Sequence, residues 1–125
     1  LQMYSSLYNW IIAIAKTEKE ILGSKPKFEL LNSYGLGHLM ITAISSTNQA
    51  GFVIRCFAPM MGVNEDPVTG SAQCALTPLW STKLGKTEMK SIQLSKRTGK
   101  LIVQMLNDKV KIQGKAITVF KAILR

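Results

Sequence analysis

The sequence predicts an α+β domain, in which a curved antiparallel sheet wraps around one central buried helix at about residues 70–84. Short apolar or alternating segments separated by turn residues occur both before and after this helix, which predicts strands on both sides of it. The helix carries apolar residues on several sides rather than along one stripe, which is typical of a helix enclosed by the fold. With 125 residues, of which 46% are hydrophobic, the chain is expected to form one domain.

Each element follows from a local pattern. In chain order we expect a strand at 8–15, helices at 17–23 and 26–32, strands at 38–45 and 52–57, the central helix at 70–84, and strands at 89–94, 100–106, 109–113 and 116–123. Thr17 and Glu20 form the Thr-x-x-Glu pattern that begins helices, and Gly23 ends this one. The polar turn at 46–49 predicts an antiparallel hairpin between the strands that flank it. Pro78 should loosen the central helix, because proline has no backbone N–H.

The chain is strongly basic, with a formal net charge of +9 and a pI near 9.8. Its lysines are scattered, however, and Lys109 and Lys111 alternate with apolar residues, which places them on the solvated face of a strand. No basic cluster with interleaved aromatic residues occurs, so we expect neither nucleic acid nor a membrane as a partner. No apolar stretch is long enough to span a bilayer, and the two cysteines form no disulfide framework. A reducing, cytoplasmic location is therefore expected.

The most informative segment, residues 55–72, leads from a strand through an acidic turn into the start of the central helix. A helix start presents backbone N–H groups that lack intrahelical partners, and these groups favour anions. Gly70 would let a ligand approach the backbone closely, and the hydroxyl of Ser71 would add a donor. Simple capping by Thr69 and Ser71 would suit a helix exposed to solvent better than an enclosed one. We therefore expect an anion site at this helix start.

Three runs of residues carry a family resemblance: Arg55-x-Phe57-Ala58-Pro59, then Glu65-Asp66-Pro67-Val68-Thr69-Gly70-Ser71-Ala72, then Gln93-Leu94-Ser95-Lys96-Arg97-Thr98-Gly99-Lys100-Leu101. They resemble the signature of the phenazine-biosynthesis (PhzF) family of isomerase-like proteins, although Thr98 and Lys100 stand where the family has glycine and glutamate. The resemblance implies the diaminopimelate epimerase-like fold, in which two similar domains enclose a cleft. It covers only the second half of the usual chain, so we expect residues 1–125 to form a single C-terminal domain whose N-terminal companion is missing.

The resemblance also implies roles for single residues. Thr69, Gly70 and Ser71 would hold a carboxylate of the substrate. Asp66 would support catalysis through a polar contact or by handling a proton. From the sequence alone, capping of the helix remains an alternative for Asp66, because a carboxylate is stabilised at a helix start.

Arg55 and Glu65 are expected to form an ion pair that supports the turn, with direct substrate contact as a second possible role for Arg55. The resemblance implies a reaction without a cofactor, whose acid/base glutamate belongs to the other domain, and no metal-binding motif is present. Cys74 is expected to be a small buried hydrophobic residue. His38, the one histidine, is expected to have a structural or surface role.

We therefore expect this domain to supply the carboxylate-binding half of a cofactor-independent proton-transfer site for a small carboxylate-bearing molecule, in a biosynthetic isomerase. The isolated chain should be inactive, because it lacks the base. A non-catalytic binding or dimerisation module on the same fold is the alternative. A basic nucleic-acid binder is a third reading, which would need lysines gathered on one face. A missing companion would expose apolar surface, so we also expect pairing with an N-terminal domain or self-association as a homodimer.

Overall fold

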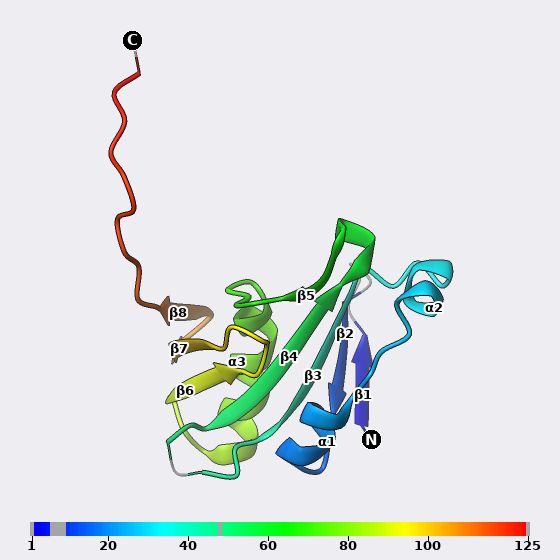
Figure 1. The fold of residues 1–125 in the computed structure, drawn as a ribbon. Coiled ribbons are helices and arrows are strands. Elements are labelled where there is room, and N and C mark those ends of the chain that lie inside the picture. The colour runs from blue at the N-terminus through cyan, green and yellow to red at the C-terminus, as the bar shows by residue number, and fades with distance from the viewer. Residues whose placement is uncertain (1, 6–9, 48, 125) are drawn as a thin grey trace.

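The computed structural model describes residues 2–5, 10–47 and 49–124. Within these ranges eight strands form one sheet with the order β1-β2-β3-β4-β6-β7-β8, and β5 pairs with β4 (Figure 1). The strands are β1 Gln2–Ser5, β2 Trp10–Ile14, β3 His38–Ile44, β4 Phe52–Ala58, β5 Val63–Asp66, β6 Glu88–Gln93, β7 Gly99–Leu106 and β8 Lys109–Gln113. The helices are α1 Glu18–Gly23, α2 Phe28–Ser33 and α3 Ala72–Leu84, with a 3₁₀ turn, η1, at Pro59–Met61.

The predicted α+β class, with a sheet around a central helix, is confirmed, but the sheet is mixed rather than antiparallel throughout. The pairs β2–β3 and β4–β6 are parallel. Parallel neighbours need a crossover connection, and here the crossovers contain α1 and α2 in one case and α3 in the other. Alternate residues of β4 pack to opposite sides: Phe52, Ile54 and Cys56 lie in the cluster with α3, whereas Val53 lies in the cluster with α1. The sheet is therefore covered by a helix on each face.

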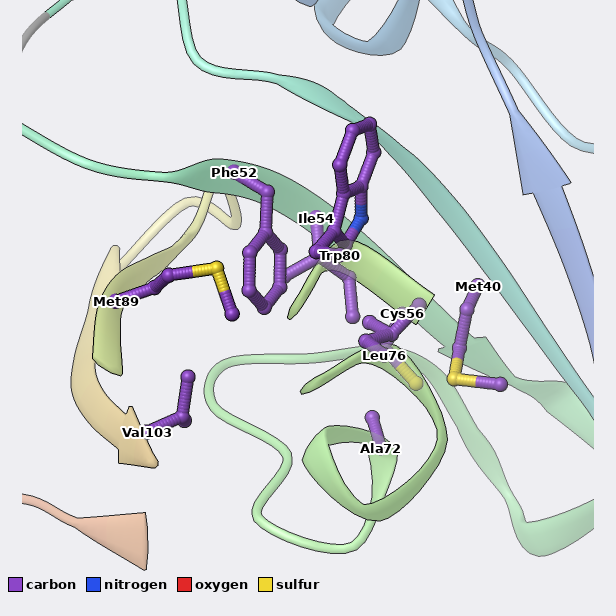
Figure 2. Close-up of a cluster of buried hydrophobic side chains, with 9 residues drawn as sticks. All are labelled: Met40, Phe52, Ile54, Cys56, Ala72, Leu76, Trp80, Met89 and Val103. Atoms are coloured by element: carbon purple, nitrogen blue, oxygen red, sulfur yellow. The ribbon is translucent and has the colours of Figure 1, made fainter. Parts of the chain in front are cut away.

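The main core lies between the sheet and α3 (Figure 2). It consists of nine buried residues from both sides of the interface: Met40, Phe52, Ile54, Cys56, Ala72, Leu76, Trp80, Met89 and Val103. The rings of Phe52 and Trp80 are stacked, with centroids 5.9 Å apart. The indole N–H of Trp80 donates to the hydroxyl of Thr42 at 3.0 Å, and that hydroxyl donates to the carbonyl of Val53 at 2.7 Å. The polar end of the tryptophan is thus satisfied inside the core, which fixes how α3 sits in the sheet.

Three differences from the predicted elements stand out. The short strands β1 and β5 were not expected, and positions 8 and 9 of the expected first strand lie outside the described residues. The expected strand at 116–123 is wrong: residues 114–124 join no sheet ladder in the part of the chain that the structure describes. This tail runs away from the sheet (Figure 1), with Ile117 89% and Phe120 79% exposed. Alternating apolar residues indicate that a segment can pair, but the position of a partner edge is a tertiary property.

The edge strand β8 shows the alternation that the sequence predicts. Lys109 and Lys111 are exposed, whereas Val110 and Ile112 between them are half-buried. These lysines therefore lie on the solvated face of an edge strand, where charge discourages unwanted pairing. Among the described residues, no helix combines the length and the apolar character needed to cross a membrane.

Candidate functional site

The candidate site forms where β5 ends and α3 begins. Strand β5 is short because it pairs only with the second half of β4, which places Asp66 opposite Cys56. The chain then turns through Pro67 and reaches the helix. The carboxylate of Asp66 accepts a hydrogen bond from the hydroxyl of Thr69, which is buried. Asp66 therefore holds the loop before the helix, and among the described residues no amide of α3 donates to its carboxylate.

The first turn of α3 leaves backbone donors open. The N–H groups of Gln73 and Cys74 donate to the carbonyls of Gly70 and Ser71, at 3.0 and 3.1 Å. In the part of the chain that the structure describes, no acceptor is found for the N–H groups of Gly70, Ser71 and Ala72, and Ser71 makes no side-chain cap. Gly70 and Ser71 are exposed. Because unpartnered amides at a helix start favour a negative charge, this arrangement can hold an anion.

Gly70 leaves open space above the loop. A Cβ built at this position meets no atom within 4 Å, and the backbone angle is one that any residue can adopt. The glycine is therefore not required by the fold. Its absence of a side chain instead keeps the backbone amides accessible to a ligand.

A buried glutamine from β6 supports the loop at 67–71 between β5 and α3, which we call the site loop. Gln93 is 2% exposed, and its side-chain oxygen accepts from the N–H of Thr69 at 2.9 Å. Its side-chain nitrogen donates to the carbonyl of Asp66 at 2.5 Å and to the hydroxyl of Thr69 at 3.1 Å. Both polar atoms of one buried side chain are thus used to fix the loop. Such a satisfied buried amide strongly favours one loop conformation.

Two more residues that follow Gln93 in the chain, Ser95 and Gly99, also contact the site loop. The hydroxyl of Ser95 donates to the carbonyl of Pro67 at 2.8 Å. Gly99 lies against the loop so closely that a Cβ would come within 2.5 Å of the Cβ of Val68. Gln93, Ser95 and Gly99 belong to the runs that resemble the family signature, but no individual role was expected for them from the sequence. The alternation gave no such signal, since β6 has few apolar residues and polar residues at alternate positions of a strand are ordinarily expected to face solvent.

Arg55 and Glu65 form the expected ion pair, on the other face of the sheet from Asp66. Two guanidinium nitrogens of Arg55 donate to the two carboxylate oxygens of Glu65, at 2.7 and 2.9 Å. A third nitrogen donates to the carbonyls of Ile21 and Ser24, at 3.1 and 2.9 Å. The hydrogen bond to Glu65 raises the pKa of Arg55. The pair therefore ties the end of α1 to β4 and β5, a supporting position without access to the helix start.

His38 lies beside the site, at the start of β3. Its ring stacks on that of Trp10, with centroids 4.1 Å apart and planes at 17°. Burial lowers the pKa of His38, and the negative charge of Asp66 opposes this shift. The neutral imidazole is thus favoured, and its ring serves as a packing partner for the tryptophan. This agrees with the structural role expected from the sequence.

The expected burial of Cys74 is wrong, because its side chain is exposed. Apolar residues surround α3, but the sheet leaves the side with Cys74 and Ala75 uncovered. The other cysteine, Cys56, is buried, and this burial raises its thiol pKa to about 11. Among the described residues, no group of three or more His, Cys, Asp or Glu side chains is placed to hold a metal ion.

The geometry therefore defines an α+β domain with an open helix start inside a curved sheet, beside a fixed carboxylate. The chain matches the model of the PhzC-PhzF family, described as phenazine biosynthesis-like protein, over residues 1–122. It belongs to this family. The family resemblance read from the sequence is thereby confirmed.

Known relatives agree with this assignment. A protein of Halalkalibacterium halodurans named an uncharacterized isomerase is 39% identical over 94% of this chain and 44% of its own length. The mouse phenazine biosynthesis-like domain-containing protein 2 is 49% identical over 58% of this chain and 26% of its own length. Among solved structures, a PhzC/PhzF protein from Clostridium difficile matches with a TM-score of 0.85 and 36% identity, over 98% of this chain and 46% of that one.

The fold is the diaminopimelate epimerase-like fold of the PhzF proteins. A PhzF-family protein from Enterococcus faecalis also matches, with a TM-score of 0.77 and 28% identity over 93% of this chain and 46% of the other. The chain thus spans less than half the length of the relatives named here.

Proposed function

We propose that this domain supplies the carboxylate-holding half of an isomerase site, in which a proton moves on a small carboxylate substrate without a cofactor. One observation carries this proposal: the amides of Gly70 and Ser71 and the hydroxyl of Ser71 form an exposed set of donors at the start of α3. Donors fixed before the reaction stabilise negative charge that develops on a bound carboxylate when a neighbouring carbon loses its proton.

The neighbouring groups support this role. Gln93 and Ser95 hold the loop in place, so the donors need no rearrangement when a ligand arrives. In this proposal Asp66, which lies just before the same loop and accepts from Thr69, adds a polar contact to the substrate. The family resemblance implies that the acid/base glutamate comes from the other domain. Relatives named isomerases, more than twice as long as this chain, fit a site completed by a second half.

Binding of a simple anion tests the donor set. Titration calorimetry with acetate or sulfate should show that Ser71→Ala weakens binding by about 1–2 kcal/mol, because one hydrogen bond to a charged group is lost. Gly70→Val should abolish binding by filling the space above the loop while leaving the fold intact, since no protein atom lies within 4 Å of its Cβ.

Diffuse attraction by the basic surface is the competing explanation. The control is the double variant Lys109→Gln and Lys111→Gln, which lowers the positive charge at a distance from the loop. It should bind anions as wild type does. Equal affinities for wild type, Ser71→Ala and Gly70→Val would rule out the helix-start site.

Catalysis should require the other half of the protein. We expect no isomerisation of small carboxylic acids by this chain alone, measured as exchange of the α-hydrogen with deuterated water by NMR. Exchange catalysed by this chain alone and abolished in Asp66→Asn would contradict the proposal that the other half of the protein supplies the acid/base group.

A non-catalytic module that pairs through its exposed surface is a second candidate function. The observation that favours it is the apolar tail, in which Ile117, Phe120 and Ile123 are exposed. Retention of pairing in a variant that no longer binds anions, such as Gly70→Val, would support this alternative.

A further inference from the structure

Three buried side chains between α3 and β6 carry oxygen atoms that have no hydrogen-bond partner among the described residues. These atoms are Oε1 of Gln73, the hydroxyl of Thr77 and the hydroxyl of Ser91. Gln73 and Thr77 are 0% exposed and Ser91 is 1% exposed, so bulk solvent reaches none of them. Buried polar groups in folded proteins almost always have a partner, because an unpaired one has lost its hydrogen bonds to water without replacement.

All three residues belong to the interface between the helix and the strand. Gln73 and Thr77 are four residues apart on α3, so their side chains are neighbours on the same face of the helix. Ser91 alternates with Met89 and Gln93 on the buried face of β6, and Met89 packs in the main core with α3. The polar side chains of the helix and of the strand therefore share one layer.

Contacts at both ends of this layer bring its two sides together. At one end, Gln73 of α3 and Gln93 of β6 both form hydrogen bonds to Thr69. At the other end, the ring of Trp80 stacks on that of Phe52, the residue of β4 that pairs with the serine of β6 (Figure 2). The three unpartnered oxygens lie between these two ends.

The nitrogen of the Gln73 side chain fixes the direction of its oxygen. This nitrogen donates to the carbonyl of Thr69 at 3.4 Å, so the oxygen points away from that carbonyl and needs a donor. The N–H of Thr69 donates to Gln93 at 2.9 Å. One glutamine from the helix and one from the sheet thus hold the backbone of Thr69 through its carbonyl and its N–H.

We propose that one ordered water molecule binds between Gln73, Thr77 and Ser91 and keeps the side chain of Gln73 in position against the site loop. The water donates to Oε1 of Gln73 and bonds to the two hydroxyls, each of which can donate or accept. Three hydrogen bonds are the usual number for a buried water. Water fits this layer better than an ion, because the buried polar side chains of the described chain include no charged group to compensate one. The inference does not depend on the proposed anion site.

Oxygen-17 magnetic relaxation dispersion, which detects water molecules that stay bound far longer than surface water, tests the site directly. Globular proteins hold roughly one buried water per 27 residues, so the difference between variants is the quantity to measure. The double variant Thr77→Val with Ser91→Ala leaves the water one partner, and the dispersion amplitude should fall by the contribution of one water molecule. Thr82→Val, on the exposed side of α3, is the control and should leave the amplitude unchanged. An unchanged amplitude in the double variant overturns the water site.

The sign of the stability change gives a second test. If the hydroxyl of Thr77 had no partner, its removal in Thr77→Val, which keeps the shape of the side chain, would stabilise the protein. With the water bound, the same change removes a hydrogen bond, so the equilibrium constant for unfolding in urea should rise by a factor of roughly 5. Thr82→Val should stay close to wild type, since threonine and valine have similar helix propensities. Stabilisation by Thr77→Val overturns the proposal.

A direct hydrogen bond from Thr77 to Gln73 is the competing explanation. It would also make Thr77→Val destabilising, but the dispersion amplitude of the double variant would then equal that of wild type. The link to the site loop has its own readout: in Thr77→Val, amide hydrogen exchange at Thr69 should accelerate by a larger factor than at the core amides of β3 and β4. An equal factor at all these amides overturns the connection between the water and the loop.

Discussion

Among the described residues, Thr98 is the one whose backbone conformation suits its side chain least well. It has φ of +56°, in the left-handed region, within the turn between β6 and β7. Threonine branches at Cβ and is disfavoured in this region, whereas the family pattern that the sequence resembles has glycine there. The replacement of the family's glycine by Thr98 therefore carries a conformational free-energy cost in the backbone. Asn107 also has a positive φ, of +53°, but asparagine visits this region more readily.

We expect Thr98→Gly to stabilise the protein. Removal of the strained side chain should outweigh the greater freedom of glycine in the unfolded chain and leave a net gain of about 0.5–1 kcal/mol. Urea denaturation followed by circular dichroism would measure it. Asn107→Gly is the matched control and should change stability by less than half as much. A loss of stability in Thr98→Gly would show that the turn is not strained.

At the scale of elements, the site loop takes its conformation from strands that lie later in the chain. The loop contributes the ligand-facing groups, whereas β6 and the start of β7 contribute Gln93 and Gly99, which hold it. Gly99 lies so close to Val68 and Pro67 that any side chain larger than hydrogen at this position would push against the loop.

Gly99→Ala should therefore destabilise the protein and disturb the loop. Its Cβ would lie 2.5 Å from the Cβ of Val68 and 3.0 Å from the carbonyl oxygen of Pro67, so the loop must move. We expect a loss of about 1–3 kcal/mol in the free energy of unfolding and weaker binding of acetate. Gly23→Ala, where a Cβ meets no atom within 4 Å, is the control. Wild-type acetate affinity in Gly99→Ala would contradict this role.

Most elements could be predicted because their signals are local. The capping pattern at Thr17, the polar turn after β3 and the alternation in β8 each depend on neighbouring residues alone, and the structure has the corresponding elements. The parallel pairs could not be predicted in this way, because hydrophobic alternation does not distinguish a hairpin from a crossover. The strand expected at 116–123 failed for a related reason, since it has the alternation but reaches no edge among the described residues.

The candidate site was predictable only where its residues are consecutive. Asp66, Thr69, Gly70 and Ser71 come together because one loop carries them, and their binding role stays a prediction. Gln93 comes from a distant strand, and the pattern around it did not indicate that its polar side chain faces inward, because polar residues occupy both faces of β6. The exposure of Cys74 could not be predicted, because it depends on which side of α3 the sheet leaves uncovered.

At the scale of the whole molecule, the tail at 114–124 carries the most exposed large apolar side chains in the part of the chain that the structure describes. Ile123 is 92% and Leu124 97% exposed, and the tail extends beyond β8 (Figure 1). Clustered exposed apolar side chains are typical of contact surfaces. The net charge of +9 acts against association of identical chains, and salt should reduce this repulsion.

We expect the chain to self-associate through this tail, more strongly in 0.5 M salt than in 0.05 M, these being conditions chosen around the range where screening becomes strong. Sedimentation velocity at increasing protein concentration would measure it. Ile117→Ser combined with Phe120→Ser should reduce association without loss of stability, since both side chains are exposed. Lys115→Gln with Lys121→Gln keeps the apolar side chains and should associate at least as strongly as wild type. A monomer at all concentrations and salt levels would contradict self-association.

The parallel seam between β4 and β6 joins the part of the sheet formed before α3, β1 to β5, to the part formed after it, β6 to β8. The seam consists of the pairs Phe52–Ser91, Val53–Ile92 and Ile54–Gln93. The site loop follows β5, which belongs to the first part of the sheet. Gln93, which holds the loop by hydrogen bonds, belongs to β6 in the second part. Opening of the seam would therefore release the loop, and any ligand that binds only the braced loop must raise the free energy of that opening. Ligand binding and the opening of the β4–β6 pair are thus coupled equilibria. Amide hydrogen exchange along β4 and β6 should therefore slow as the site fills.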